Sequence, residues 1–521
     1  MSFLHRPVQP VVIGAAAALV AACLGMHWLR FLRFAIASIL YPYELDYGEG
    51  IVWQQALLVP GPRMYGDINQ YPFIVFHYPP FYHLVVRAVS ALGIDMLVAG
   101  RSISLLAALV IGVVCARLAY LATPAGMERG ARLAGAVTAS LTVFCCLPVI
   151  HWAALMRVDM LAVALSIVGV LAVVSSVGRP FLVYAGGFLF LLAIYTKQTS
   201  LAAPIASLPL LLTISRRRTV VVGCLTLVVG CGALLLLEID TGGGFLRHIV
   251  LYNLNRYRLA SMIDGIGSLW PQVIFCIYMV GGLIIGWRNV AKGGSWRNFE
   301  IFKREVAENV STRTLCTMTI YLLLTMCMIP MLGKSGAGQN YLIETVCVWS
   351  IFVGTFAAWI IEPLIQPWSK NERTERKALP LLSAVFLLWL LFMQMQIMPT
   401  SVGEYNRVTP QYRAALDSLV ARIAGAKKPV LSDDMVLLMR AGKEVPWEPA
   451  IFAELASQGR WDQRLIIERI NSREFAMIVT SGRRGSLLFD ARYTPEVSRA
   501  IEAAYPYSEQ VAGRTVRLPA D

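Results

Sequence analysis

The stretch from Tyr41 to Pro80 reads YPYELDYGEGIVWQQALLVPGPRMYGDINQYPFIVFHYPP and follows directly on the first long apolar segment of the chain. It places Glu44, Asp46 and Glu49 within six positions, at the point where that segment should leave a membrane. Ionisable side chains at such a place are costly unless they face water, a partner or a substrate. We therefore take this acidic loop as the first candidate functional site.

Composition places the chain among polytopic membrane proteins, so we expect membrane lipids to surround it. Of its 521 residues, 57% are hydrophobic and only 15% are charged, which lies far outside the range of soluble domains. The formal net charge of +14 does not indicate a nucleic-acid partner, because the basic residues cluster in short loops between apolar runs. All ten cysteines fall inside apolar segments, so they predict neither a disulfide framework nor a metal site.

Apolar runs of about 20 residues are long enough to cross a bilayer as helices. Such runs predict about eleven spans, near residues 11–30, 96–122, 132–150, 159–177, 181–196, 199–215, 219–238, 268–287, 314–332, 341–361 and 379–398. Basic residues concentrate in the loops around 129–132, 216–218, 288–313 and 370–377, which the positive-inside rule assigns to the cytoplasm together with the N-terminus. The opening loop and the tail then lie on the outer side.

The tail differs from the rest of the chain. From Pro399 onward the composition is that of a soluble domain, with strands predicted at 429–432, 475–480 and 515–518 and helices near 410–424, 449–458, 461–471 and 495–504. We expect residues 1–398 to form a membrane domain with a first outer loop at 41–95. Residues 399–521 should form a small α/β domain outside the membrane, large enough to bury a core of its own.

The opening loop could supply a positioned carboxylate for general acid–base chemistry. Asp46 is followed by Gly48, which lets backbone or substrate approach closely, and Glu49 comes next as a second acid. The alternative is that these acids only solvate a loop end, which is our interpretation of Glu44. A metal-binding trio would lack histidine spacing, so no cofactor is expected and a divalent metal is not indicated.

Two further ionisable positions lie at predicted outer ends of spans. In Met156-Arg157-Val158-Asp159-Met160, Arg157 suits a phosphate and Asp159 suits a second acid, although Asp159 could simply offset a helix dipole. Lys197 lies in a polar break on the outer side, where the positive-inside rule least expects a lysine. It could bind a lipid phosphate or could snorkel to the interface.

Later loops offer further polar groups. Arg256 lies in a basic-aromatic loop that suits either interfacial anchoring or a phosphate, and Lys334, Asn340 and Tyr341 flank a glycine-broken turn. We expect both loops to contact substrate. In the tail, Asp433-Asp434 follows a predicted strand, as in many active-site loops, but acidic pairs also cap helices.

A proline pair begins the last part of the opening loop. Tyr78-Pro79-Pro80 precedes the segment 81–93, which is too short to span a membrane and has an amphipathic pattern. Because proline suits the first turn of a helix, we predict a helix that starts here and lies at the membrane interface.

Taken in order, these motifs resemble a known family. They are Glu44-Leu45-Asp46-Tyr47-Gly48-Glu49-Gly50, Tyr65-Gly66-Asp67, Tyr78-Pro79-Pro80-Phe81-Tyr82, Arg157-Val158-Asp159, Lys197-Gln198-Thr199 and Asn340-Tyr341. The ordered set is similar to the GT-C glycosyltransferases of the protein-mannosyltransferase and aminoarabinose-transferase type. The tail is similar to the outer domains that some of these enzymes carry.

The resemblance implies an α-helical GT-C fold in the bacterial cytoplasmic membrane. It also implies inverting transfer of a sugar from a polyprenyl-phosphate donor to a lipid, glycan or protein acceptor on the outer face. Asp46 would act as the base, supported by Glu49 and Asp159. Many members have an adjacent Asp-Glu pair, whereas Asp46 and Glu49 are three positions apart. A lipid-linked saccharide transporter and a non-catalytic scaffold are the alternatives.

The polar residues singled out along the chain also predict where substrate binds. Arg157 and Lys197 would stabilise the departing phosphate. Tyr78, Arg256 and Lys334 are expected at the substrate site together with the Asn340-Tyr341 pair.

Overall fold

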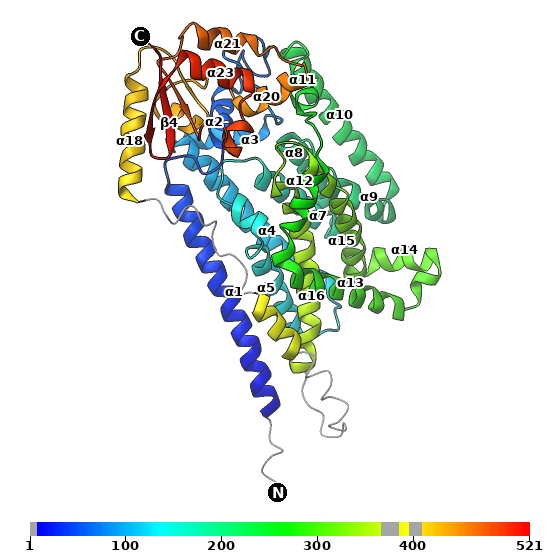
Figure 1. Ribbon diagram of the computed structural model, residues 1–521. Coiled ribbons are helices and arrows are strands. Elements are labelled where there is room, and N and C mark those ends of the chain that lie inside the picture. Colours follow the sequence, from blue (N-terminus) through cyan, green and yellow to red (C-terminus); the bar gives the residue numbers. More distant parts are fainter. Residues whose placement is uncertain (1–7, 366–384, 395–408, 521) are drawn as a thin grey trace.

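The structure is a computed structural model that describes residues 8–365, 385–394 and 409–520. Most of these residues are helical (Figure 1). The membrane part contains α1 (Val8–Leu40), α2 (Glu49–Leu58), α3 (Phe81–Ser90), α4 (Met96–Ala122), α5 (Arg129–Val143), α6 (Leu147–Trp152), α7 (Asp159–Val174), α8 (Phe181–Thr196), α9 (Ala202–Ile214), α10 (Arg216–Asp240), α11 (Gly244–Ile249), α12 (Leu259–Gly267), α13 (Val273–Lys292), α14 (Phe299–Glu308), α15 (Val310–Met326) and α16 (Ile343–Ile365). Short 3-10 turns connect several of them: η1 (Leu251–Asn253), η2 (Trp270–Gln272), η3 (Ser295–Arg297), η4 (Ile329–Gly333) and η5 (Gln339–Leu342).

Helix lengths in the described part of the chain bear on the predicted spans. Six stretches are long and apolar enough to cross a membrane, namely Ala18–Leu40, Met96–Ala122, Arg216–Asp240, Leu259–Lys292, Val310–Gly333 and Gln339–Pro363. Shorter apolar helices cover Asp159–Val174, Phe181–Thr196, Ala202–Ile214 and Val385–Gln394. The predicted segment 132–150 is divided between α5 and α6, where Pro148 begins a new helix. The total of eleven spans stays a prediction, because the segment 379–398 lies partly outside the described residues.

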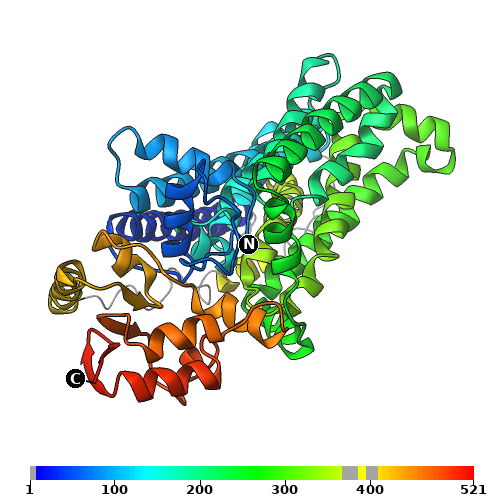
Figure 2. The same cartoon turned by 90° about the horizontal axis from the view of Figure 1, so that it is seen from above.

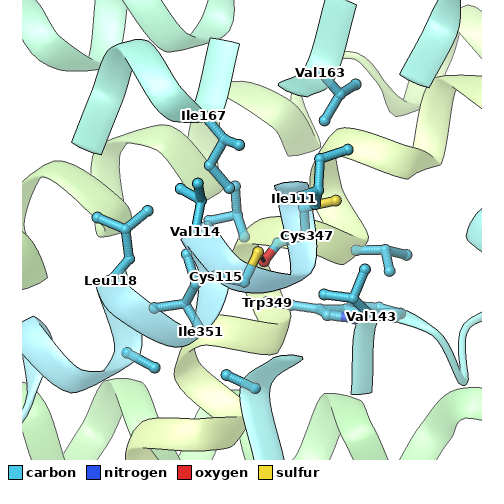
Figure 3. Close-up of a cluster of buried hydrophobic side chains, with 14 of the residues drawn as sticks. Ile111, Val114, Cys115, Leu118, Val143, Val163, Ile167, Cys347, Trp349 and Ile351 are labelled. Carbon is cyan, nitrogen blue, oxygen red and sulfur yellow. Dashed lines mark hydrogen bonds between the residues drawn. The ribbon is translucent and has the colours of Figure 1, made fainter. Parts of the chain in front are cut away.

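The helices pack around α16. In the span that contains α16, 83% of the most apolar window is buried, compared with 6% in α10, so α16 is central and α10 is peripheral. Gly135 of α5 and Gly354 of α16 allow close helix contact, since a Cβ on either would lie 2.4 Å from the other's carbonyl oxygen. Figure 3 shows side chains of α4, α5, α7 and α16 meeting in this core, with the Cys115 thiol donating to the Cys347 carbonyl at 3.4 Å. All ten cysteines are free.

The tail holds a four-stranded sheet in the order β1-β2-β4-β3. The β1–β2 pair is parallel, and β4 runs antiparallel to both β2 and β3. Strands occur where they were predicted near 430, 477 and 515, whereas β3 was not predicted because its side chains are mostly exposed and polar. The elements are α18 (Pro410–Gly425), β1 (Val430–Ser432), α19 (Met435–Arg440), α20 (Pro449–Ser457), α21 (Arg464–Asn471), β2 (Met477–Thr480), α22 (Leu487–Asp490), α23 (Pro495–Ala504), β3 (Tyr507–Val511) and β4 (Arg514–Leu518).

The tail packs against the opening loop, and the two share hydrophobic cores. Both views of the molecule place the tail beside the opening loop (Figures 1 and 2), and Figure 1 shows it at the end opposite the N-terminus. A Cβ on Gly50 of α2 would lie 2.5 Å from the Cβ of Met435 in α19. The Gln54 amide donates to the Val445 carbonyl at 3.1 Å. One of these cores is formed mostly by tail residues, joined by Ile68, Phe73 and Val75 of the opening loop, and the division of the tail from the membrane part at residue 399 stays a prediction.

Candidate active site

Asp46 lies between α1 and α2 and pairs with Arg157, which lies just before α7. The Arg157 Nη1 to Asp46 Oδ1 distance is 2.9 Å, and the Gly48 N–H donates to the same carboxylate oxygen at 3.1 Å. A Cβ on Gly48 would lie 1.5 Å from Arg157 Nη1, so this ion pair requires a glycine. Burial disfavours the charged guanidinium, but the neighbouring carboxylates, led by Asp46, outweigh it and raise the pKa of Arg157.

A second ion pair joins α7 to α8. The Lys197 Nζ to Asp159 Oδ1 distance is 2.6 Å, and the Asn340 amide of η5 donates to the same oxygen at 2.9 Å. Lys197 Nζ also lies 4.7 Å from the centre of the Tyr341 ring, within cation–π range. Asp159 Oδ2 is buried and has no hydrogen-bond partner among the described residues. Burial opposes the charge on Lys197, yet Asp159 raises the pKa of this amine.

Tyr78 connects the two pairs. Its hydroxyl lies within electrostatic reach of Arg157, Asp159, Lys197 and Tyr341, and burial raises the pKa of Tyr78. The Tyr65 hydroxyl holds this segment by donating to the Tyr78 carbonyl at 2.8 Å. As predicted, α3 begins directly after Pro80. The structure thus brings together residues from the opening loop, α7, α8 and η5 that lie up to 295 positions apart in the sequence (46 to 341).

Glu49 has a different environment from Asp46. Its side chain is 0% exposed, as is that of its partner Arg101, whereas the Asp46 side chain is 24% exposed. Arg101 Nε and Nη2 donate to the two Glu49 oxygens at 2.8 and 2.6 Å. The Leu45 and Met156 N–H groups donate to the same carboxylate, each at 2.9 Å. These contacts leave Glu49 no access to a reacting group, so its geometry fits a residue that holds the loop in place.

Arg101 is a site residue that the sequence reasoning missed. Its guanidinium also donates to the carbonyl oxygens of Ser38, Tyr41 and Tyr43, at 2.7, 2.5 and 2.7 Å, and so closes the turn after α1. An arginine inside an apolar span carries a cost that demands a partner. That signal in the segment 96–122 could have identified it.

Lys334 and Arg256 lie on two backbone segments that hydrogen-bond to each other, but within the described part of the chain only the Arg256 side chain has a carboxylate partner. Arg258 N–H donates to the Gly333 carbonyl at 2.7 Å, and Ser335 N–H donates to the Arg256 carbonyl at 2.7 Å. Arg256 is held by Glu454 of α20, with Nε 3.3 Å from the carboxylate. Lys334 makes no ion pair with a carboxylate among the described residues, and burial followed by the nearby Lys197 lowers the pKa of Lys334.

The tail contributes side chains that no sequence pattern indicated. Glu448, just before α20, lies 3.1 Å from His77 Nε2, and the Tyr47 hydroxyl accepts a hydrogen bond from the Ala450 N–H at 3.1 Å. His77 directly precedes the Tyr78-Pro79-Pro80 motif and could have been flagged by that position. Glu448 is an ordinary helix-preceding acid about 370 positions away, so only the fold reveals this contact.

Three acids for which the sequence suggested solvation or helix capping, Glu44, Asp433 and Asp434, are buried or paired in the structure. Glu44 is not a solvated loop end: its Oε2 atom is buried without a hydrogen-bond partner among the described residues, and burial raises its pKa. Asp434 accepts from the Leu437 N–H at 3.4 Å, as a helix cap, and from Arg514 Nη2 at 2.7 Å. Asp433 pairs with Arg492 at 3.0 Å.

Within the described residues, no group of three or more histidine, cysteine, aspartate or glutamate side chains is arranged to hold a metal ion. A cavity of about 510 Å³ is lined by the α4–α5 connection, α13, α15 and α16. Because the start of α4 lies at the site and this cavity lies at its other end, the cavity is remote from Asp46.

Comparison with solved structures places the whole chain in one fold. The chain is similar to ArnT from Cupriavidus metallidurans bound to undecaprenyl phosphate, with 14% identity, a TM-score of 0.54, and coverage of 96% of this chain and 97% of that one. It is also similar to the apo oligosaccharyltransferase of Archaeoglobus fulgidus, with 11% identity, a TM-score of 0.56, and coverage of 97% and 73%. No family model matches the chain, and no curated protein matches its sequence. The likeness confirms the expected GT-C fold.

Proposed function

We propose that the chain is an inverting glycosyltransferase of the bacterial cytoplasmic membrane. It would move a sugar from a polyprenyl-phosphate donor to a lipid, glycan or protein acceptor on the outer face. The observation that carries this proposal is the convergence of Asp46–Arg157 and Asp159–Lys197 at one end of a GT-C bundle. In this orientation the N-terminus is cytoplasmic and the tail is periplasmic or extracellular.

Asp46 is the proposed base. The acceptor hydroxyl or amine attacks the anomeric carbon from the face opposite the phosphate, and its proton passes to the Asp46 carboxylate. The bond from the anomeric carbon to the phosphate oxygen breaks, and the phosphate leaves with the electron pair, which inverts the anomeric centre. Arg157 at 2.9 Å holds the carboxylate in its orientation, while the 24% exposure of Asp46 leaves it accessible to an acceptor.

The departing phosphate needs positive charge that is not already neutralised. Arg157 and Lys197 each have an aspartate partner, whereas Lys334 has no carboxylate partner among the described residues and lies close enough to Lys197 for mutual repulsion. We assign Lys334 to the phosphate, with Lys197 completing the charge. Tyr78, Asn340 and Tyr341 then line the same site.

Three of the predicted site residues receive positioning roles in this proposal. Glu49 positions the Asp46 loop through Arg101 and is not a proton carrier, because both side chains are fully buried and mutually paired. Arg256 binds Glu454 and so attaches the outer loop to the tail. Asp159 orients Lys197 and Asn340.

The donor class rests on support from the structural neighbours. One of them, ArnT, is seen bound to undecaprenyl phosphate, and AglB from Archaeoglobus fulgidus, similar at 10% identity with a TM-score of 0.50, is seen with a dolichol-phosphate. Both ligands are polyprenyl phosphates. The neighbours support a lipid-linked donor for this chain, while the sugar has to be found by experiment.

The test is a turnover assay with purified protein and a panel of polyprenyl-phosphate sugars, following release of polyprenyl phosphate. Wild-type protein should consume at least one donor. Asp46→Asn should lower its turnover by about 100-fold or more. Asp67→Asn is the matched control, because Asp67 is an exposed acid of the same loop whose carboxylate accepts from the Asn69 N–H at 2.9 Å.

Two outcomes would overturn the proposal. Absence of turnover with every donor would favour the transporter or scaffold alternatives. Unchanged turnover in Asp46→Asn would remove Asp46 from the chemistry.

A further inference from the structure

Arg492, in the tail between α22 and α23, covers the aromatic ring of Tyr47 in the opening loop. The Arg492 guanidinium carbon lies 4.1 Å from the centre of that ring, which is a close cation–π contact. Arg492 is itself fixed by Asp433, whose Oδ2 lies 3.0 Å from Nη1. Asp433 in turn accepts from the Ser481 N–H and hydroxyl at 2.8 and 2.9 Å. The guanidinium is therefore held from behind by the ends of β1 and β2.

Tyr47 is also held at its other end. Its hydroxyl accepts a hydrogen bond from the Ala450 N–H at 3.1 Å, in the first turn of α20. The tail thus contacts one loop side chain twice, once on the ring and once on the hydroxyl. Arg492 is buried and the Tyr47 hydroxyl contact is partly buried, so water competes less with them than at the surface.

Tyr47 is covalently adjacent to Asp46, so fixing its side chain fixes the backbone that carries the proposed base. That turn is tight: the Gly48 N–H donates to Asp46 Oδ1 at 3.1 Å, and the Glu49 N–H donates to the Asp46 carbonyl at 3.0 Å. A backbone displacement at Tyr47 would carry Asp46 away from Arg157. A displacement of about 1 Å at a reacting group can cost about 100-fold in rate.

We propose that Arg492 is a positioning residue of the active site, acting through Tyr47 to hold Asp46 in its working geometry. The inference rests on the proposed transferase function. The tail is then a structural part of the catalytic centre, because it holds the base in place without touching the reacting atoms. Arg492 is buried, and its guanidinium is engaged by the Asp433 carboxylate and by the Tyr47 ring.

The experiment compares Arg492→Ala and Arg492→Lys in the full-length protein, with the donor identified in the turnover assay. Arg492→Ala should lower kcat by about 10- to 100-fold and leave KM for the donor within about twofold. Arg492→Lys keeps a cation near the ring and should recover part of the loss. Arg464→Ala is the matched control, since Arg464 is an exposed tail arginine that pairs with Asp462 at 2.6 Å.

Variants of Tyr47 separate positioning from folding. Tyr47→Phe keeps the ring and should retain most of kcat, whereas Tyr47→Leu removes the ring and should match Arg492→Ala. If Arg492 acts through the ring, the Arg492→Ala and Tyr47→Leu double variant will be no slower than the slower single variant. Should Arg492→Ala fail to fold, the comparison of Tyr47→Leu with Tyr47→Phe still decides, because both leave the Arg492–Asp433 pair intact.

Wild-type kcat in folded Arg492→Ala overturns the inference, and so do multiplicative losses in the double variant. A rise in donor KM with kcat unchanged would also overturn it, because that pattern places Arg492 in binding. These outcomes all presuppose wild-type turnover, so they are distinct from failure of the transferase proposal, in which wild type consumes no donor.

Discussion

Replacing Glu49 by glutamine separates the roles of the two acids in the opening loop. Glu49 and Arg101 are both 0% exposed and joined by two hydrogen bonds at 2.8 and 2.6 Å. Removing one partner of a fully buried pair leaves the other charge uncompensated, which typically costs about 3–5 kcal/mol. We expect Glu49→Gln to lower the free energy of unfolding by about that amount. The Arg101 charge, which also serves three backbone carbonyls, would have no other carboxylate partner among the described residues.

The assay has two parts. Thermal unfolding of detergent-solubilised protein, followed by tryptophan fluorescence, should give a lower midpoint for Glu49→Gln than for wild type. Glu496→Gln should leave it unchanged, because Glu496 belongs to an exposed tail pair with Arg499 at 3.4 Å. Turnover is then measured well below the unfolding midpoint, where Glu49→Gln should keep far more activity than Asp46→Asn.

The opposite pattern would refute the reasoning. If Glu49→Gln unfolds at the wild-type midpoint and its turnover falls as far as that of Asp46→Asn, then Glu49 takes part in the chemistry. The burial and pairing of Glu49 would in that case be a poor guide to its role.

Three further predictions follow from the site and its surroundings. Gly48→Ala places a Cβ 1.5 Å from Arg157 Nη1, so the ion pair with Asp46 must open and turnover should fall by about 100-fold. Gly126→Ala is the control, because a Cβ there would have nothing within 4 Å and turnover should not change. Lys334→Met should raise the donor KM by about tenfold through loss of a charge-assisted hydrogen bond, and an unchanged KM would remove Lys334 from the phosphate site. Burial lowers the pKa of His248 from 6.5 to about 4, so the unfolded chain binds a proton that the folded chain rejects. Stability should be insensitive to His248 above about pH 6.5 and fall by up to about 3 kcal/mol as the pH drops towards 4. Unfolding midpoints at several pH values should show a smaller loss for His248→Gln, and equal losses would contradict the assignment.

The class of fold could be predicted because a membrane helix is recognisable from its local sequence. An apolar run must satisfy its backbone within the segment, so hydropathy alone places α4, α10 and α16 close to where the structure has them. The break between α5 and α6 was not predicted, since Pro148 lies inside a continuous apolar run. The strand β3 was missed for the opposite reason: its exposed polar side chains carry no buried pattern, and only pairing with β4 defines it.

The candidate site divides in the same way. Asp46, Asp159 and Lys197 could be singled out because ionisable groups beside apolar spans are costly and therefore conspicuous. Their ion-pair partners could not be predicted from the sequence. The sequence predicts Lys197 near a phosphate and Glu49 near the reacting groups, but it does not predict that Lys197 pairs with Asp159 at 2.6 Å or that Glu49 pairs with Arg101.

The sequence by itself determined that this is a membrane protein. It also indicated which loops carry the ionisable candidate residues, and that Asp46 is the acid to examine first. Hydropathy, charge and motif order along the chain are enough for those conclusions. Only the tertiary structure decided which charge neutralises which, that Glu44 is enclosed, and that the tail reaches Tyr47 through Arg492. The physical reason is that a charge pair depends on distances of about 3 Å between groups that lie tens to hundreds of residues apart, and only packing sets such distances.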